Sequence, residues 1–416
     1  MNSLDWNGCE LHSRAMTVTP SLKGYLIIVK IGGTTVVVLV QLARGRFLFR
    51  KVWKNMRVKA EDERKYLETV FDKLGFSQQD GQLLADTLVD ADLRGISSHG
   101  IQRLAWYRQM IKDGTIVPTK QPKVVRELPG SVLVDANQNM GQIAANLAMD
   151  KVIEKAKKVG VGIAVVRNSN HFGIAGYYAR KALAAGLVGI ALTNTRPLVV
   201  PTNATQAFLG SNAFAFGFPA SPHPFMFDGA TAAVAGGKIQ VADKKGQELP
   251  GEWVVDKDRK VVKDPKEAED ILATAAFSEG EQRGGGLVTL GGNKEVNANY
   301  KGMGNSIVVE LLTGILAQGS ISADTVSGKH DFSQFLFAFD PAFFGDPETL
   351  KADATAMLNR IRGLEHIPGK KTWVPGDREY RYLKENKQDG VSIDDKTYEE
   401  ISAIGKELGV AVPQEI

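Results

Sequence analysis

The stretch VGIAVVRNSNHFGIAGYYARKALAAGLVGIALTNT, from Val161 to Thr195, decides the class of fold that this sequence predicts. Residues 161–169 and 187–195 are short apolar runs typical of buried strands. Between them, residues 173–186 have the pattern of a helix. A strand, a helix and a second strand in this order indicate an α/β fold. The histidine of this stretch, His171, lies where the first strand ends, and α/β proteins tend to place binding residues there.

The pattern changes on both sides of this stretch. Residues 60–114 have apolar side chains at three- and four-residue spacing, which predicts a small helical unit. Residues 114–137 carry three prolines and short β-branched runs, as expected of a crossing into a sheet. Further on, we expect an apolar helix beginning near Gly304 and a strand at residues 332–341. The last helices are expected to return and pack on the N-terminal ones.

The composition excludes several classes of protein. The chain has 416 residues, of which 43% are apolar, and this is enough for a globular protein of several subdomains. The net charge of +4 comes from mixed charges, without the basic block interleaved with aromatics that suits nucleic acid. The single cysteine, Cys9, excludes an intrachain disulfide and fits a reducing compartment. We therefore expect a cytoplasmic protein without a nucleic-acid partner.

The first 55 residues differ from the rest. The apolar stretch Tyr25–Ala43 is long enough to raise the question of a membrane span, but Lys30 and the pair Gly32–Gly33 interrupt it. No convincing cleavage site of a signal peptide follows it. We expect residues 1–55 to be an extension outside the chemistry, and we expect no membrane association.

Common cofactor and catalytic motifs do not fit. A Rossmann fingerprint, Gly-x-Gly-x-x-Gly after a strand, does not occur. A P-loop at residues 232–239 fails because Ala232 replaces its first glycine and Ile239 replaces the residue that holds magnesium. The six histidines show no spacing typical of a metal site, so we predict no metal centre. Ser211 lacks the partner pattern of a nucleophile.

The segment DLRGISSHGIQR suggests an anion site. Ser97 or Ser98 is a candidate N-cap of a helix, which places His99 in the first turn and Arg103 on the same face one turn later. A guanidinium can hold a carboxylate through two hydrogen bonds while a nearby imidazole exchanges a proton. The segment therefore fits a 2-oxo or 2-hydroxy acid. In the alternative interpretation, His99 only helps to cap the helix and Arg103 faces solvent.

Five further residues are candidates for function on local grounds, and most of them also have a structural interpretation. His171 follows three polar residues that can fix its tautomer, but it also fits an ordinary polar turn. Thr195 and Arg196 follow the next strand and reach the same edge, or form a turn before a proline. Lys301 precedes Gly-Met-Gly, where a cation and a flexible backbone can meet a phosphate. Asp228 can accept from a ribose hydroxyl or cap the next helix.

Taken together, the motifs resemble the malate/L-lactate dehydrogenase family of the non-Rossmann type, which includes ureidoglycolate dehydrogenase, sulfolactate dehydrogenase and diketogulonate reductase. The matching stretches run in the family's order from about Met56 to the C-terminus: DLRGISSHGIQR, NSNHFGIAGYYARKA, LGSNAFAFGFP, FDGAT, YKGMG, VELLTGIL and VPGDRE. The resemblance implies an oxidoreductase that transfers a hydride between a nicotinamide cofactor and a small 2-hydroxy or 2-oxo acid, with malate or lactate first. NAD or NADP fits, with NAD slightly favoured.

The resemblance also implies an architecture. It predicts a non-Rossmann α/β sheet domain that binds NAD(P), with a helical domain built from both chain ends, and it implies a homodimer. The expected parts are an extension at 1–55, the first part of the helical domain at 56–125, a central α/β domain for cofactor and substrate at 126–345, and C-terminal helices that pack on the helical domain at 346–416.

Family roles carry over position by position. His171 matches the proton acceptor of ureidoglycolate dehydrogenase, and His99 matches the proton donor of diketogulonate reductase, so two assignments compete. Ser98, Arg103 and Thr195 fall at positions for the substrate, with Arg103 as the carboxylate clamp. The positions that contact the cofactor are Asp228, Gly229, Ala230, Lys301, Gly302, Pro375, Gly376 and Asp377.

Some departures leave other functions open. The chain has Thr-Asn-Ala-Thr at 202–205 where the family has a Gly-Gly turn, and Met303 where the family has tyrosine. The alternatives are a cyclic imine acid reductase, a ureidoglycolate-type dehydrogenase, and a ligand-binding protein of the same fold without turnover.

Overall fold

The computed structural model describes residues 56–416 except 245, 276–283 and 327–330, together with four strands nearer the N-terminus. These strands form one antiparallel sheet in the order β1-β2-β3-β4, with the bounds Leu11–Arg14, Gly24–Ile31, Thr34–Ala43 and Arg46–Val52. The stretch Tyr25–Ala43 therefore contains two paired strands. Among the residues described, no helix combines the length and the apolar character needed to cross a bilayer.

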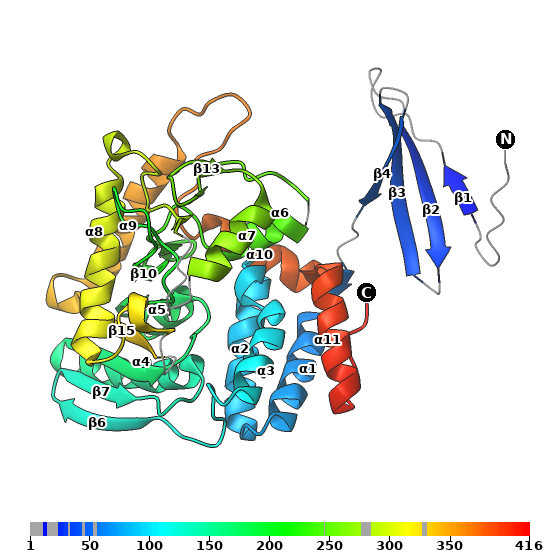
Figure 1. Cartoon of the computed structure of the whole chain (residues 1–416). Helices are drawn as coiled ribbons and strands as arrows, with labels where there is room; N and C mark the ends of the chain where they lie inside the picture. The colour runs from blue at the N-terminus through cyan, green and yellow to red at the C-terminus, as the bar shows by residue number, and fades with distance from the viewer. Residues whose placement is uncertain are drawn as a thin grey trace, which may run out of the picture.

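A seven-stranded mixed sheet forms the centre of the molecule (Figure 1). Its order is β11-β10-β9-β15-β8-β7-β6. The bounds are β6 Lys123–Leu128, β7 Ser131–Asp135, β8 Val161–Ser169, β9 Val188–Thr193, β10 Ala213–Phe218, β11 Phe225–Ala230 and β15 Phe332–Phe339. Strand β15 lies between β8 and β9 and is antiparallel to both, so β8 and β9 run in the same direction. Their carboxyl ends therefore meet at one edge of the sheet.

Two helices pack closely on this sheet, α4 (Gly141–Val159) and α5 (Ala175–Ala184). Helix α5 connects β8 to β9, as the sequence predicts. Glycines allow the close approach: a Cβ on Gly162 would lie 2.1 Å from the carbonyl oxygen of Val152, and one on Gly189 would lie 2.6 Å from that of Ala179. The helix backbones thus pack directly on the first residues of β8 and β9.

A second core belongs to a helical unit that contains both ends of the region from residue 56 onward. It combines α1 (Ala60–Lys73), α2 (Gln78–Leu93), α3 (Leu104–Lys112), α10 (Asp377–Asp389) and α11 (Asp395–Leu408). Strands β5 (Met56–Val58) and β16 (Val391–Ile393) pair antiparallel and join the two ends. The expected fold class, an α/β sheet domain with a helical domain built from both chain ends, is confirmed.

A smaller layer contains α6 (Gly237–Lys244), α7 (Pro265–Ala275) and the short strands β12 (Val254–Val255), β13 (Val261–Val262) and β14 (Gly286–Leu287). Helix α8 (Asn299–Glu310) continues into a π-helical turn, η4 (Leu311–Ile315), which contacts β15. The predicted start of this helix near Gly304 is wrong, because the helix begins five residues earlier at Asn299.

Two further expectations need correction. The predicted helix start at Ser97 or Ser98 is wrong: the short 3-10 turns η1 (Ser97–His99) and η2 (Ile101–Arg103) precede α3, and neither has a side-chain cap. Helix α9 (Pro347–Arg362) does not join the helical core, because its buried Leu358 packs with Ala220 and Val374.

Candidate active site

A cavity of about 610 Å³ lies between the helical unit and the central sheet. The helical unit contributes His99, Arg103 and Trp106, while His171 follows β8 and Thr195 follows β9. The last two meet because their strands end at the same edge of the sheet. The structure therefore brings together both predicted catalytic histidines, the predicted carboxylate clamp and the predicted substrate-binding threonine.

The two histidine rings are stacked, with centroids 5.4 Å apart and planes inclined by 24°. Burial lowers the pKa of His99 to about 3, and the charge of Arg103 adds to this effect. The pKa of His171 is well below its usual value, first because of burial and then because of His99 and Arg103. Both imidazoles are therefore neutral at neutral pH, and each is able to accept a proton.

A hydrogen-bonded chain orients His171. Its Nδ1 lies 2.6 Å from the hydroxyl of the buried Tyr107, which also accepts a hydrogen bond of 3.0 Å from Nε2 of Gln142. In this arrangement Tyr107 donates to Nδ1, so the neutral ring carries its proton on Nε2. The side-chain oxygen of Gln142 is buried without a partner. If the amide turns over, it accepts from Tyr107, and the hydroxyl oxygen then accepts from Nδ1–H. The chain accommodates both tautomers of His171.

A buried carboxylate holds the segment that carries His99 and Arg103. Oδ2 of Asp92 accepts a hydrogen bond of 2.6 Å from the backbone N–H of Ile101. Gly100 permits this contact, because an added Cβ would lie 1.9 Å from the same oxygen. Glu63 is fully buried beside Asp92, and burial raises the pKa of both carboxyl groups, that of Asp92 to about 7. Short turns, rather than one helix, therefore place His99 and Arg103 in the cavity.

Within this segment, Ser98 contacts both functional side chains. Its hydroxyl lies 2.9 Å from Nδ1 of His99, and its carbonyl accepts a hydrogen bond from Nε of Arg103. The guanidinium carbon of Arg103 lies 5.7 Å from the centre of the Trp106 ring. Ser98 thus positions His99 and Arg103. Burial lowers the pKa of Arg103, although an arginine remains charged at neutral pH.

The opposite wall is formed by the residues after β9 and by the start of α6. The hydroxyl of Thr195 accepts a hydrogen bond of 2.9 Å from the backbone N–H of Ser211. Arg196 also lines the cavity. A Cβ on Gly237 would lie 2.8 Å from Cβ of Ser98, so the start of α6 approaches the histidine-bearing segment directly. This close contact closes one side of the cavity.

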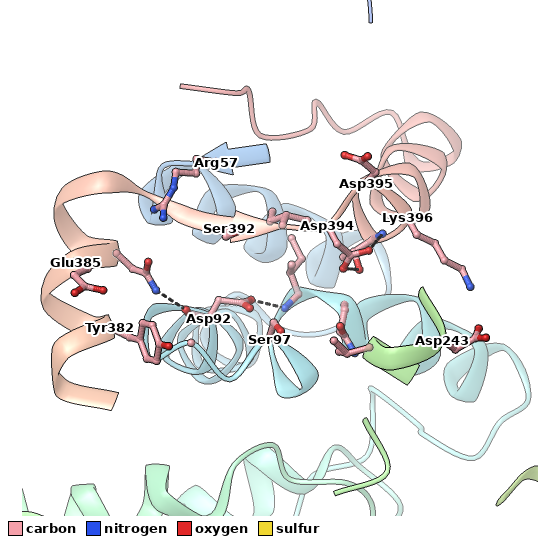
Figure 2. A pocket seen from close by; sticks show the side chains of 17 residues that line it. Arg57, Asp92, Ser97, Asp243, Tyr382, Glu385, Ser392, Asp394, Asp395 and Lys396 are labelled. Carbon is pink, nitrogen blue, oxygen red and sulfur yellow. Dashed lines mark hydrogen bonds between the residues drawn. The ribbon is translucent and has the colours of Figure 1, made fainter. Parts of the chain in front are cut away.

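A second cavity, of about 540 Å³, lies on another side of the same segment (Figure 2). Figure 2 shows the side chains of Asp92, Tyr382, Ser392 and Asp394 around it, with a dashed hydrogen bond at the carboxylate of Asp92. Neither predicted catalytic histidine lines it. The chemistry therefore belongs to the first cavity. Within the described ranges, no group of three or more histidine, cysteine or acidic side chains is placed to hold a metal ion.

Residues 58–402 match the sequence model of a family described as malate/L-lactate dehydrogenase. The chain belongs to this family. It is 35% identical to a malate dehydrogenase of Pyrococcus abyssi, over 85% of this chain and 96% of the relative. It is 34% identical to an L-sulfolactate dehydrogenase of Methanocaldococcus jannaschii, over 86% of this chain and 98% of the relative. A crystal structure of malate dehydrogenase from Entamoeba histolytica superposes with a TM-score of 0.82 at 31% identity, covering 87% of this chain and all of the other.

As a member of the malate/L-lactate dehydrogenase family, the protein is an oxidoreductase that acts on the CH–OH group of hydroxy acids with a nicotinamide cofactor. Two of the positions expected to contact the cofactor meet on the edge strand β11. Asp228 is exposed there, and its Oδ2 accepts a hydrogen bond of 2.7 Å from the backbone N–H of Gly176 near the start of α5. The backbone N–H of Met226 donates to the carbonyl of Pro375 at 3.3 Å, so Pro375 and Gly376 contact β11 at Met226, two residues before Asp228 along the strand.

The third expected segment lies at the other end of β11. Thr231 follows Gly229 and Ala230 and accepts, at its carbonyl, a hydrogen bond of 3.1 Å from the backbone N–H of Leu290. Gly302 packs on Leu290, because an added Cβ would lie 2.4 Å from its carbonyl oxygen. Lys301 is exposed beside it. The segment at Pro375 therefore contacts β11 directly, whereas Gly302 reaches the end of this strand through Leu290.

One expected cofactor contact has another role. The carboxylate of Asp377 accepts hydrogen bonds of 3.1 and 2.8 Å from Arg362 and lies 3.1 Å from Nε2 of His223. It also accepts from the backbone N–H of Val374 at 3.0 Å. These contacts leave its oxygens paired with protein groups. The side chain of Asp377 therefore fixes the turn at Pro375 rather than offering itself to a ligand.

Sequence reasoning missed three residues of the site. Tyr107 lies one helical turn after Arg103 in the apolar helix pattern, and this spacing could have found it. Arg196 was expected at the same sheet edge as Thr195, with a polar turn as the alternative, and it lines the cavity. Gln142 and Gly237 carry no local signal, because their roles depend on contacts across the domain boundary.

Proposed function

We propose that this protein catalyses the reversible oxidation of malate to oxaloacetate, with NAD as the preferred cofactor. The observation that carries the proposal is the stacked pair of neutral histidines beside Arg103 in one cavity. A neutral imidazole can accept the hydroxyl proton, and a guanidinium can hold the carboxylate next to the reacting carbon. The similarity to proteins named malate dehydrogenase supports malate as the first substrate.

In this proposal, His171 carries the proton. When the amide of Gln142 is turned so that it accepts from Tyr107, the hydroxyl oxygen of Tyr107 accepts from Nδ1–H of His171, and in this tautomer Nε2 accepts the proton of the C2 hydroxyl during oxidation. Arg103 binds the C1 carboxylate, and Ser98 holds Arg103 in place. His99 and Thr195 orient the substrate. A bound nicotinamide supplies the hydride acceptor at its C4. During reduction, Nε2 of His171 returns the proton to the 2-oxo oxygen.

The carboxylate of Asp228 supports the proposed preference for NAD. An acidic side chain accepts hydrogen bonds from a ribose hydroxyl and repels a 2′-phosphate. Asp228 is exposed on β11 between the segments around Pro375 and Gly302. If Asp228 faces that part of the cofactor, replacing it with asparagine should narrow the difference in KM between NAD and NADP.

A test follows the absorbance of the reduced nicotinamide. The purified protein is given NAD or NADP with malate, lactate, sulfolactate or ureidoglycolate, and the reverse reaction is run with the 2-oxo acids. We expect the highest kcat/KM with malate and NAD. Turnover only with a cyclic imine acid would instead indicate an imine reductase, and tight cofactor binding without any turnover would indicate a ligand-binding protein.

The pH dependence tests the role of His171. Because its pKa is lowered well below its usual value, the neutral base persists at mildly acidic pH. We expect kcat/KM for oxidation to change by less than about threefold between pH 6 and 8, whereas an unshifted histidine would give a larger fall at the acidic end. A clear loss with a midpoint near pH 6.5 would contradict the assignment.

We further propose that the protein is a cytoplasmic homodimer. Helix α8 and its continuation η4 expose apolar side chains on successive turns, including Ile307, Leu311 and Ile315 at 41%, 53% and 55%. A row of this kind suits a partner surface. Sedimentation equilibrium should give twice the chain mass, and cell fractionation should place the protein with the cytoplasm. The single cysteine fits a reducing compartment.

A further inference from the structure

We propose that Arg196 selects substrates with a second anionic group, by binding that group at the end of the substrate opposite the C1 carboxylate held by Arg103. The inference rests on the proposed function and extends it: the substrate class is a dianion such as a four-carbon dicarboxylate. Arg196 follows Thr195 at the end of β9 and lines the same cavity as Arg103 and the two histidines.

Within the described ranges, the guanidinium of Arg196 forms no ion pair or hydrogen bond with the protein. Among the described residues, neither Arg196 nor Arg103 forms an ion pair with a carboxylate, and Arg196 donates no side-chain hydrogen bond. Other arginines near the junction of the two units behave differently. Arg180 and Arg94 both pair with Asp90. Arg103 and Arg196 therefore differ from Arg94 and Arg180, because they line a cavity without an acidic partner among the described residues.

The two guanidiniums also affect each other. Burial, and then the charge of Arg103, lowers the pKa of Arg196, so the two cations lie close enough to repel. A ligand with two negative groups relieves this repulsion at both ends, whereas a monoanion relieves it at one. The cavity volume of about 610 Å³ accommodates a four-carbon acid together with a ring of a cofactor.

The acidic side chains of the cavity do not pair with Arg103 or Arg196 among the described residues. Acidic side chains line the cavity from α6, α7 and α11: Asp243, Glu269, Asp270 and Glu400. Within the part of the chain that the structure describes, no ion pair joins any of them to Arg103 or Arg196. The two arginines come from different units, Arg103 from the helical unit and Arg196 from the end of β9. A dianion held by both therefore bridges the units across the histidine pair.

The kinetic test compares malate with 2-hydroxybutyrate, which has the same chain length and one carboxylate. In Arg196→Gln, we expect kcat/KM for malate to fall about 100-fold, as for a lost charge-assisted hydrogen bond, and that for 2-hydroxybutyrate to stay within about threefold. Arg196→Lys, which keeps the charge, should recover about tenfold of the loss with malate. Arg103→Gln should impair both substrates. An equal loss with both substrates in Arg196→Gln, or no loss with malate, would overturn the inference.

A binding test decides the role of Arg196 independently of turnover. Calorimetry of the full chain with succinate and with butyrate needs no reaction. We expect Arg196→Gln to weaken succinate about 100-fold and to leave butyrate unchanged. If the parent enzyme oxidises neither hydroxy acid, the proposed function fails, yet this selective loss would still support the anion site. Equal affinities of parent and variant for succinate, or no binding of succinate to the parent, would refute it.

Discussion

Replacing Tyr107 with phenylalanine tests how the site controls its proton carrier. Tyr107 is fully buried. Its hydroxyl oxygen lies 2.6 Å from Nδ1 of His171 and 3.0 Å from Nε2 of Gln142. Phenylalanine keeps the ring and its packing but removes both hydrogen bonds. Among the described contacts, Nδ1 of His171 then keeps the one of 3.4 Å from the backbone N–H of Gly173, and Nε2 of Gln142 loses its bond to Tyr107. The orientation of the catalytic ring is then less tightly held.

The expected loss can be estimated from these contacts. An intramolecular hydrogen bond contributes about 1 kcal/mol, and leaving a buried polar group unpaired costs about 1–3 kcal/mol. If about 1.4–2.8 kcal/mol of this appears in the transition state, kcat falls about 10- to 100-fold, because each 1.36 kcal/mol is a factor of ten. KM for malate should stay within about threefold, since Arg103 and Thr195 are untouched.

The assay measures kcat and KM for malate oxidation together with the free energy of unfolding in urea. Tyr66→Phe is the matched control, because Tyr66 is 2% exposed and its hydroxyl donates to the carbonyl of Ile401 at 2.6 Å in the helical core. Both variants should lose about 1–3 kcal/mol of stability. Only Tyr107→Phe should lose kcat. A kcat within twofold of the parent, or the same loss in both variants, would refute the orienting role.

Two further predictions concern the surroundings of the site. Gly237→Ala should raise KM for malate at least about tenfold, because the new Cβ would lie 2.8 Å from Cβ of Ser98. Gly304→Ala is the control and should leave KM unchanged, because no atom lies within 4 Å of its added Cβ. Similar KM values for both variants would contradict the tight contact at Gly237. Burial, with Asp92 nearby, raises the pKa of Glu63 in the folded protein well above its usual value of 4.5, so the folded state holds an extra proton and its stability falls as pH rises above about 4.5. Urea titrations should show that the free energy of unfolding of Glu63→Gln depends less steeply on pH than that of the parent, by up to about 1.4 kcal/mol per pH unit. The same pH dependence in both proteins would contradict the raised pKa of Glu63.

The order of elements was predictable because it is a local property of the chain. The run from Val161 to Thr195 forms β8, α5 and β9 close to the expected positions. Apolar spacing and glycine positions are set by neighbours in sequence, so they are readable without the fold. Boundaries were less predictable. The helix expected at Ser97 is replaced by two 3-10 turns. The backbone N–H of Ile101 donates to the carboxylate of Asp92, a buried residue of α2, and this bond holds the segment in its turns.

The sequence by itself determined the α/β class, the family and the identity of His99, Arg103, His171 and Thr195 as candidates, since these depend on residue types at fixed spacing. The tertiary structure alone decided which groups meet. Strand β15 enters between β8 and β9 from the far end of the chain, and its pairing sets the direction of both strands. Contacts between residues distant in sequence depend on this packing, and no local pattern encodes the bond between Tyr107 and His171, 64 residues apart.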